Sequence, residues 1–179
     1  RSTPKPSSAT SDVYKRQYKH LNINYSIPQS CDWLMQFKSQ FELNWSNDSI
    51  SKHFQNENSF NLIIQQDQIP IGLLIGHYIF QDIKLIEFEI LHIALLPNYR
   101  NQGYGYKLLI ELEKHLKIKE KTINIFLETG SANKFAIKLY EKLGYKIYNE
   151  RKNYYGSKSI NSPLSQDAIL FVKSLNAIS

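Results

Sequence analysis

Residues 97–109, with the sequence PNYRNQGYGYKLL, form the part of the chain best suited to bind an anion. Gly103 and Gly105 stand where a strand is expected to end and an amphipathic helix to begin. Glycine allows backbone angles and close approaches that other residues do not, and the first N–H groups of a helix lack intrahelical partners. Together with the helix dipole, these features predict a phosphate site, and a diphosphate is the natural guest.

Two common phosphate-binding motifs do not match this turn. A dinucleotide fingerprint needs a third glycine where Leu108 stands, and a P-loop needs Gly-Lys-Ser/Thr after the turn. On the turn alone, the alternative interpretation is an ordinary tight turn whose glycines ease the start of a helix.

Hydrophobic periodicity predicts the elements that must hold this turn. Two opening helices are expected, over residues 28–41 and from an N-cap at Ser46 to residue 54. Strands are expected at residues 60–66, 71–80, 85–96, 122–128, 145–149 and 167–175. A helix of about four turns after Pro97 and another from Asn133 to Gly144 complete the order ααβββαβαββ. The strand, helix, strand succession implies a right-handed parallel crossover, so we expect an α+β domain.

Length and composition predict a single domain. The chain has 179 residues, and 42% of them are hydrophobic. Its first seventeen residues are rich in serine, proline and threonine, and their composition differs from that of the rest of the chain. They also resemble translated sequencing-adapter sequence. We therefore expect residues 1–17 to be disordered or non-native and residues 18–179 to form the domain.

Charge and cysteine content indicate which partners and which cellular compartment to expect. Of the formal charge of +6, four basic residues against one acidic residue place +3 within the first seventeen positions. Cys31 is the single cysteine, which forbids an internal disulfide and favours a reducing compartment. No apolar run approaches the roughly 20 residues that span a bilayer. We expect a soluble cytoplasmic protein with no membrane or nucleic-acid partner; the sequence does not predict its oligomeric state.

A second motif, SANKFAIKLYEKLGYK, begins at Ser131. The turn fits the pattern R/Q-x-x-G-x-G/A, and the second motif fits N-x-x-A-x-x-L-Y-x-x-x-G-F/Y. Both occur in the right order and on the right elements, and together they resemble the GNAT superfamily of acetyltransferases. The resemblance implies a mixed, mostly antiparallel sheet with a central parallel strand pair flanked by helices. It also implies N-acetyl transfer from acetyl-coenzyme A without a metal.

The resemblance extends to the RimI-type enzymes, over residues 41–175. The matching pieces are Trp45-Ser46, Ile93-Ala94, Leu127-Glu128 and Asn153-Tyr154-Tyr155. This likeness implies that the acceptor is the N-terminal alanine of the eighteenth small-subunit ribosomal protein. Departures from the family pattern occur at His92, Arg100 and Thr129-Gly130, and they bear on peptide selectivity more than on acetyl-coenzyme A binding.

The resemblance assigns the cofactor side of the site to one strand, one turn and the start of one helix. The backbone of Ile93, Ala94 and Leu95 would bind the pantetheine arm and lend an N–H to the oxyanion, and Asn133 would anchor the arm from the other side. The pyrophosphate would lie on the turn formed by Arg100, Asn101, Gln102, Gly103, Tyr104, Gly105 and Tyr106.

Two side chains are candidates for proton transfer. Glu128 ends a strand whose apolar residues point to one face, so its carboxylate lies on the other face, where the resemblance places the general base. A solvated charge at a strand end is the alternative. Tyr140 would protonate the departing thiolate, although it falls on an apolar helical stripe and could equally be a core residue.

The acceptor side is expected to include aromatic walls. Trp45, Tyr154 and Tyr155 are the candidates, with simple packing as the alternative.

The cofactor motifs would look the same in a GNAT enzyme acting on a polyamine or an aminoglycoside, so such a small-molecule acceptor is the alternative function. A nucleic-acid-binding module is the rival from another class, suggested by the basic balance. The five histidines show no spacing typical of metal ligands.

Overall fold

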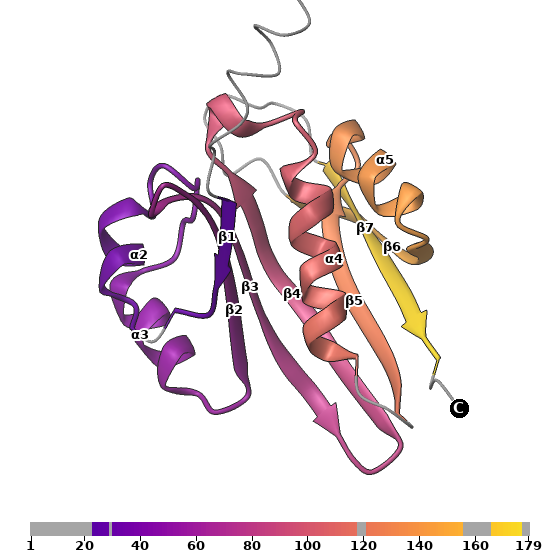
Figure 1. The fold of residues 1–179 in the computed structure, drawn as a ribbon. Helices are drawn as coiled ribbons and strands as arrows, with labels where there is room; N and C mark the ends of the chain where they lie inside the picture. Colours follow the sequence, from indigo (N-terminus) through magenta and orange to yellow (C-terminus); the bar gives the residue numbers. More distant parts are fainter. Residues whose placement is uncertain (1–22, 29, 118–120, 156–165, 177–179) are drawn as a thin grey trace, which may run out of the picture.

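A seven-stranded mixed sheet organises the chain in a computed structural model, which describes residues 23–28, 30–117, 121–155 and 166–176. The strand order is β1-β2-β3-β4-β5-β7-β6 (Figure 1). Neighbouring strands are antiparallel except for the central pair of β4 and β5, which is parallel. This arrangement confirms the predicted fold class. The expected tail at residues 1–17 lies outside the described residues.

The strands agree closely with the apolar runs of the sequence. Their bounds are β1 Ile23–Ser26, β2 Ser59–Gln66, β3 Ile69–Gln81, β4 Leu85–Leu95, β5 Thr122–Gly130, β6 Lys146–Tyr155 and β7 Gln166–Leu175. Two differences stand out, because β1 was not predicted and β6 runs six residues further than expected. Both are edge strands, whose exposed positions accept polar residues and so carry little hydrophobic alternation.

The helices are α2 Asp32–Phe37, α3 Asn47–Gln55, α4 Tyr104–Leu116 and α5 Lys134–Lys142, and a 3₁₀ turn, η1, covers Pro97–Tyr99. Ser46 caps α3 as predicted, because its side chain accepts a hydrogen bond from the Ser49 N–H. The first helix is shorter than predicted, yet Phe41 beyond its end is fully buried. None of the described helices combines the length and apolar character needed to cross a membrane.

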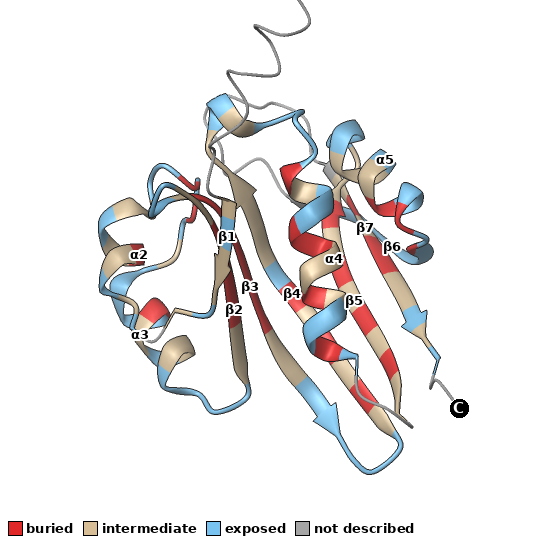
Figure 2. Ribbon diagram, viewed as in Figure 1, coloured by how far each residue is buried: buried red, intermediate tan, exposed pale blue. Residues whose placement is uncertain are grey.

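The sheet separates two hydrophobic cores. On one face, α4 packs against β2, β3 and β4 with its buried stripe toward the strands, and the core that it shares with α5 also includes residues of β5 and β7 (Figures 1 and 2). On the other face, α2 and α3 cover β2 and β3 through a smaller core that includes Leu34, Phe41 and Ile50. Alternation within β2 assigns the faces, since Leu62 and Ile64 belong to the first core and Ile63 to the second.

Candidate active site

The parallel strands β4 and β5 separate at their carboxyl ends. They pair over residues 85–90 and 122–127 only. Beyond Ile90, β4 stays paired with β3, and β5 stays paired with β7 as far as Gly130. Among the described strands, none pairs with residues 91–95 of β4 on the β5 side, so their main-chain groups can bind an extended ligand. This edge contains the three predicted pantetheine-binding residues, Ile93, Ala94 and Leu95.

An extra residue in β4 accompanies the separation. Ile75 pairs with His92 and Gly76 pairs with Ile90, which leaves Leu91 as a bulge. A bulge bends its strand and increases the local twist. The bulge thus lies at the point where β4 leaves β5.

The predicted phosphate turn joins η1 to α4. Gly103 is the N-cap of α4 and has a left-handed backbone, with φ of +82°, and Asn101 has φ of +58°. Left-handed residues in a turn direct neighbouring N–H groups toward one side, as in anion-binding backbone nests. A Cβ atom added at Gly103 would find no heavy atom within 4 Å, so the space beside this backbone is open. The turn therefore has the room and the donors that a diphosphate needs.

Gly105 lies inside the first turn of α4 and has a packing role. An added Cβ would lie 3.2 Å from Leu139 Cδ2 and 3.8 Å from Leu95 Cδ1. The absence of a side chain lets α4 approach α5 and the end of β4. A substitution here would disturb packing as well as any ligand, which makes Gly103 the cleaner position for a test.

The side chain of Arg100 is engaged by the protein itself. Its Nε donates to the Leu95 carbonyl at 3.0 Å, and its Nη2 lies 2.8 Å from Glu42 Oε1. Gln102 Nε2 likewise donates to the Asn98 carbonyl at 2.6 Å. These bonds tie the turn to the end of β4 and to the loop after α2, so both side chains hold the turn in shape.

The two tyrosines of the turn lie in different surroundings. Tyr104 is 9% exposed, belongs to the core under α4 and contacts the Tyr99 ring edge to face. Tyr106 is exposed, and the ammonium group of Lys142 lies 5.6 Å from its ring centroid. Tyr104 thus anchors the start of α4, and Tyr106 lies at the surface beside α5.

Glu128 lies where β5 loses its pairing with β4. It follows Leu127, the last residue of β5 in that ladder. Ile123, Ile125 and Leu127 are buried under α4, so the alternation places the Glu128 carboxylate on the opposite face. Its side chain is 24% exposed, and its Oε2 lies 3.2 Å from Arg151 Nη1.

Arg151, a residue that sequence reasoning missed, reaches Glu128 from β6. The strand β7 lies between β6 and β5, so the guanidinium spans that strand. Its Cζ also lies 5.1 Å from the centroid of the Tyr154 ring. The structure therefore brings together Glu128, Arg151 and Tyr154. The sequence held no signal for this contact, because irregularities in β6 decide which of its charged residues faces Glu128.

Tyr140 is buried between other aromatic rings. It is 3% exposed and contacts Phe171 and Tyr145, with ring centroids 5.5 Å and 6.0 Å away. Burial raises its pKa to about 12, so the phenol keeps its proton throughout the physiological range. The residue is thus part of the core, as the alternative interpretation held, and its phenol carries a proton at physiological pH.

Asn133 is the N-cap of α5. Its Oδ1 accepts a hydrogen bond from the Ala136 N–H at 3.2 Å. The cap uses the carbonyl oxygen and leaves the amide nitrogen, a donor, for other partners. Asn133 has the same place in its helix as Gly103 has in α4.

The predicted aromatic walls come from the loop before α3 and from the end of β6. Trp45 packs against the second core, contacts the His53 ring edge to face and lines a hollow with Asn44, Ser46 and Ser49. Tyr154 is 53% exposed on β6. Tyr155 ends β6, and its side chain lies outside the described part of the chain. Of the three, Tyr154 is the one whose described contacts join it to Glu128, through Arg151.

His92, where the sequence departs from the family pattern, is neutral at pH 7. Burial lowers its pKa from the ordinary value, and the Phe41 carbonyl and the nearby Glu42 oppose that shift only in part. Its Nε2 donates to the Phe41 carbonyl at 3.0 Å. The residue ties β4 to the loop after α2.

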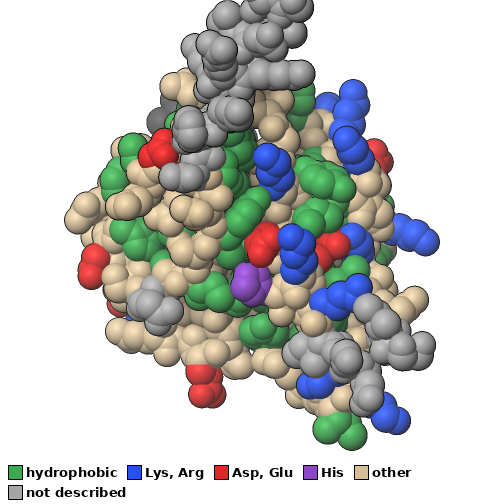
Figure 3. Space-filling view, in the orientation of Figure 1, with side chains coloured by type: hydrophobic (Ala, Val, Ile, Leu, Met, Phe, Trp, Pro, Cys, Tyr) green, Lys and Arg blue, Asp and Glu red, His purple; other side chains and the backbone are tan. Residues whose placement is uncertain are grey.

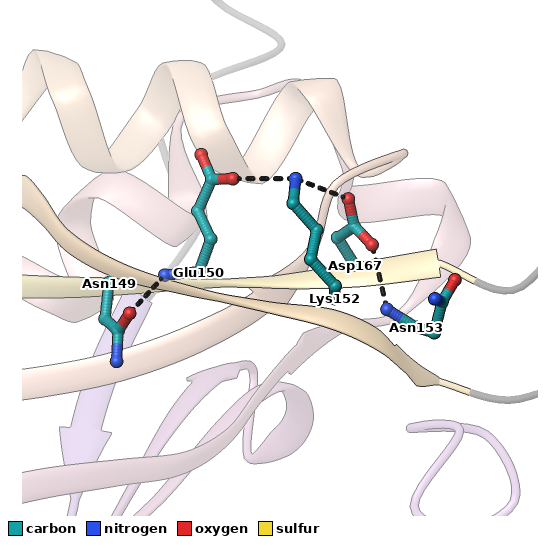
Figure 4. Close-up of polar contacts among 5 residues, drawn as sticks. All are labelled: Asn149, Glu150, Lys152, Asn153 and Asp167. Atoms are coloured by element: carbon teal, nitrogen blue, oxygen red, sulfur yellow. Dashed lines mark hydrogen bonds and ion pairs between the residues drawn. The ribbon is translucent and has the colours of Figure 1, made fainter.

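A cluster of polar contacts holds the far end of β6 against β7 (Figure 4). Asp167 accepts hydrogen bonds from the Asn153 N–H at 2.9 Å and from Lys152 at 3.1 Å, and Lys152 also lies 3.1 Å from Glu150. These donors hold the pKa of Asp167 below its ordinary value. Asn153 has φ of +54° and lies where the register between Arg151 and Tyr155 shifts. The cluster thus fixes an irregular segment that carries Arg151 and Tyr154.

Charges of both signs mix on the surface over α4. Lysine and arginine side chains there alternate with acidic ones (Figure 3). This mixture differs from the continuous basic patch typical of nucleic-acid-binding proteins. Within the described ranges, no cluster of three or more histidine, cysteine, aspartate or glutamate residues could hold a metal ion.

The relatives of this chain include ribosomal protein bS18-alanine N-acetyltransferases. A ribosomal protein bS18-alanine N-acetyltransferase from Haemophilus influenzae is 36% identical over 136 residues, which cover 73% of this chain and 86% of the relative. The protein of the same name from Escherichia coli is 33% identical over 111 residues, 62% of this chain and 70% of the relative.

Solved structures share the fold. The crystal structure of the ribosomal-protein-S18-alanine N-acetyltransferase from Escherichia coli superposes with a TM-score of 0.72 and 24% identity, covering 88% of this chain and 96% of that one. NAA60 from Arabidopsis thaliana in complex with acetyl-CoA gives a TM-score of 0.68 and 18% identity, covering 86% and 99%. The sequence profile of the Acetyltransferase (GNAT) family matches residues 27–145. The chain therefore belongs to the GNAT family of acetyltransferases, enzymes that take their acetyl group from acetyl-coenzyme A.

Proposed function

We propose that this enzyme acetylates the N-terminal alanine of ribosomal protein bS18, with acetyl-coenzyme A as the acetyl donor. The observation that carries the proposal is the 36% identity to a relative of that name, most of whose length the chain covers. The position of Glu128 beside the separated strands supports it, because an amine held there would lie close to a ligand bound along β4. A ribosomal-protein acceptor implies that the enzyme works in the cytoplasm. Residues 18–179 are the proposed catalytic domain.

The residues around the separated carboxyl ends of β4 and β5 fit acetyl-coenzyme A. The open space beside Gly103 and the unpaired N–H groups of the first turn of α4 suit the pyrophosphate. The exposed edge of β4 at Ile93, Ala94 and Leu95 suits the amide-rich pantetheine arm, and Asn133 offers a donor from α5. In this proposal Arg100 and Gln102 act by holding the turn.

Glu128 is proposed as the general base. A peptide α-amine has a pKa of about 7.7 to 8.0, so a substantial fraction is already neutral near pH 7.5. The carboxylate has only to accept the remaining proton, directly or through a water molecule. Main-chain N–H groups of β4 would stabilise the negative charge that develops on the carbonyl oxygen.

Tyr140 is proposed as the donor to the departing sulfur. Replacing it with phenylalanine is expected to lower kcat about tenfold. This is below the usual range for acid–base catalysis, because a thiolate with a pKa of about 8.5 leaves without full protonation. The ring contacts with Phe171 and Tyr145 remain, so the melting temperature and acetyl-coenzyme A affinity should stay near wild type. A variant with wild-type kcat would leave Tyr140 as a core residue only.

The acceptor can be tested with three substrates. A bS18 N-terminal peptide with a free alanine should be acetylated far faster than the same peptide with a blocked terminus and intact lysines, or than a polyamine. Trp45, Tyr154 and Tyr155 are proposed walls of a slot that admits a small first residue. Mass spectrometry should locate the acetyl group on the α-amine. Acetylation on lysine, or equal rates for free and blocked peptides, would contradict the proposal, and preferred turnover of the polyamine would favour a small-molecule acceptor.

A further inference from the structure

The ion pair between Arg151 and Glu128 places a fixed positive charge beside the proposed base. The two side chains are 49% and 24% exposed, with 3.2 Å between Nη1 and Oε2. An isolated surface pair of this kind contributes little to stability, because solvent screens it and both side chains must be ordered. The guanidinium can instead affect function, because it repels any third positive charge that approaches the carboxylate.

A second contact, with the Tyr154 ring, helps to hold the guanidinium in place. The Tyr154 ring lies over it, at 5.1 Å from Cζ to the ring centroid. Asp167 binds the Asn153 N–H and the Lys152 ammonium group, which pins the segment between Arg151 and Tyr155 where it leaves the regular ladder (Figure 4). Arg151 therefore depends on more than its bond to Glu128 for its position.

Among the described residues, Arg151 is the cation that is paired with Glu128. The same face of β4 carries Glu89, which pairs with His77 at 3.1 Å, and His92, which is neutral at pH 7. On β7, the residue that pairs with Glu128 is Leu170, which has no charge. A carboxylate has about four acceptor positions, and the hydrogen bond from Arg151 occupies one of them.

We propose that Arg151 is a specificity-determining residue that disfavours acceptors arriving as ammonium ions and thereby selects α-amines over lysine side chains and polyamines. The inference rests on the proposed function, because it takes Glu128 as the base. Near pH 7.5, roughly a third of an α-amine with a pKa of about 7.8 is neutral, against about one lysine in a thousand at a pKa of about 10.4. A bare carboxylate would offset this difference by attracting the ammonium form, whereas the guanidinium repels it.

The test compares two acceptors on four proteins: wild type, Arg151→Gln, Arg151→Lys and Lys146→Gln. One peptide has a free α-amine and no lysine, and the other has a blocked terminus and a single lysine. The measured quantity is the ratio of kcat/KM for the lysine peptide to kcat/KM for the α-amine peptide, at pH 7.5. If a substitution displaced Glu128, it would slow the reaction of both peptides by the same factor. That factor cancels in the ratio, so the ratio reports selectivity alone.

Arg151→Gln should raise the ratio about tenfold, mainly through a lower KM for the lysine peptide, because the repulsion is gone. Arg151→Lys keeps the charge and should retain the wild-type ratio within about twofold. Lys146→Gln removes another cation of the same strand and should also retain the ratio. The strand registers place Lys146 two strands across and two residues along from Glu128, roughly 12 Å away, beyond the screening length of about 8 Å at physiological salt. Melting temperature and acetyl-coenzyme A affinity establish that each variant is folded.

An unchanged ratio in Arg151→Gln, or an equal loss toward both peptides, would overturn the assignment and leave Arg151 with a structural role. Different results would contradict the proposed function. If Glu128→Gln retained wild-type kcat toward the α-amine peptide, Glu128 would not be the base. If the wild-type enzyme turned over neither peptide, or preferred the lysine peptide, both the acceptor and the inference would be refuted.

Discussion

Replacing Glu128 with glutamine is expected to lower kcat for an α-amine peptide by about 10² to 10³-fold at pH 7, within the range typical of general acid–base catalysis. Glutamine keeps the size of the side chain and an oxygen that can accept from Arg151, while it removes the proton acceptor. At pH 7 most of an α-amine with a pKa of about 7.7 to 8.0 is protonated, so the loss is largest there. Above pH 8 the amine is mostly neutral without help, and activity should partly recover.

The pH profile is the decisive measurement for this variant. Acetyl-coenzyme A affinity by calorimetry should match wild type, because Glu128 lies on β5, apart from the turn that precedes α4. A lysine-peptide acceptor should show its recovery at a higher pH, in line with its higher amine pKa. A variant whose profile parallels that of the wild type would remove Glu128 from the mechanism.

Gly103→Val should weaken acetyl-coenzyme A binding about 10²-fold or more. At φ of +82°, a β-branched residue is strained, and its side chain would enter the open space beside the N–H groups of the turn. Loss of one or two hydrogen bonds to a charged group, at about 1.5 to 3 kcal/mol each, corresponds to a loss of this size. Calorimetric titration with acetyl-coenzyme A gives the affinity directly.

Gly144→Val is the matched control for the strain. Gly144 has φ of +84°, and an added Cβ there also finds nothing within 4 Å, but it lies at the opposite end of α5 from Asn133. Both variants should lose a similar amount of stability, about 1 to 2 kcal/mol for a left-handed L-residue. Only Gly103→Val should lose affinity. Equal affinities in the two variants would contradict the assignment of the turn.

The periodic apolar residues accounted for most of the fold. The stripe of leucines in α4 and the alternation of Ile123, Ile125 and Leu127 in β5 predicted both elements and the face on which Glu128 lies. The short edge strand β1 lacked such a pattern and was missed. The predicted strand at residues 145–149 stopped short of residues 150–155, because the partner strand β7, rather than their own polar composition, holds these residues in the sheet.

The site was predictable in its backbone features and less so in its side-chain directions. Gly103 and the cap at Asn133 follow from local rules for helix starts, and the structure places both as expected. The directions of Arg100 and Arg151 depend on Glu42 and Glu128, which lie 58 and 23 residues away in sequence. Contacts of that kind arise from the register and bulges of the sheet, which a single sequence does not specify.

The division of the interior into two cores implies that the molecule does not resist unfolding evenly. The larger core joins α4 and α5 to the central strands, and a partly buried ion pair of 2.6 Å between Lys173 and Glu113 adds a tie between β7 and α4. The smaller core is capped by two short helices, and α2 begins without a side-chain cap. Segments with few buried contacts open at lower free energy than the rest of a protein. Local opening is therefore cheapest at α2 and α3, and an enzyme loosened by mutation or heat would lose order there while the half that holds the phosphate turn is still folded.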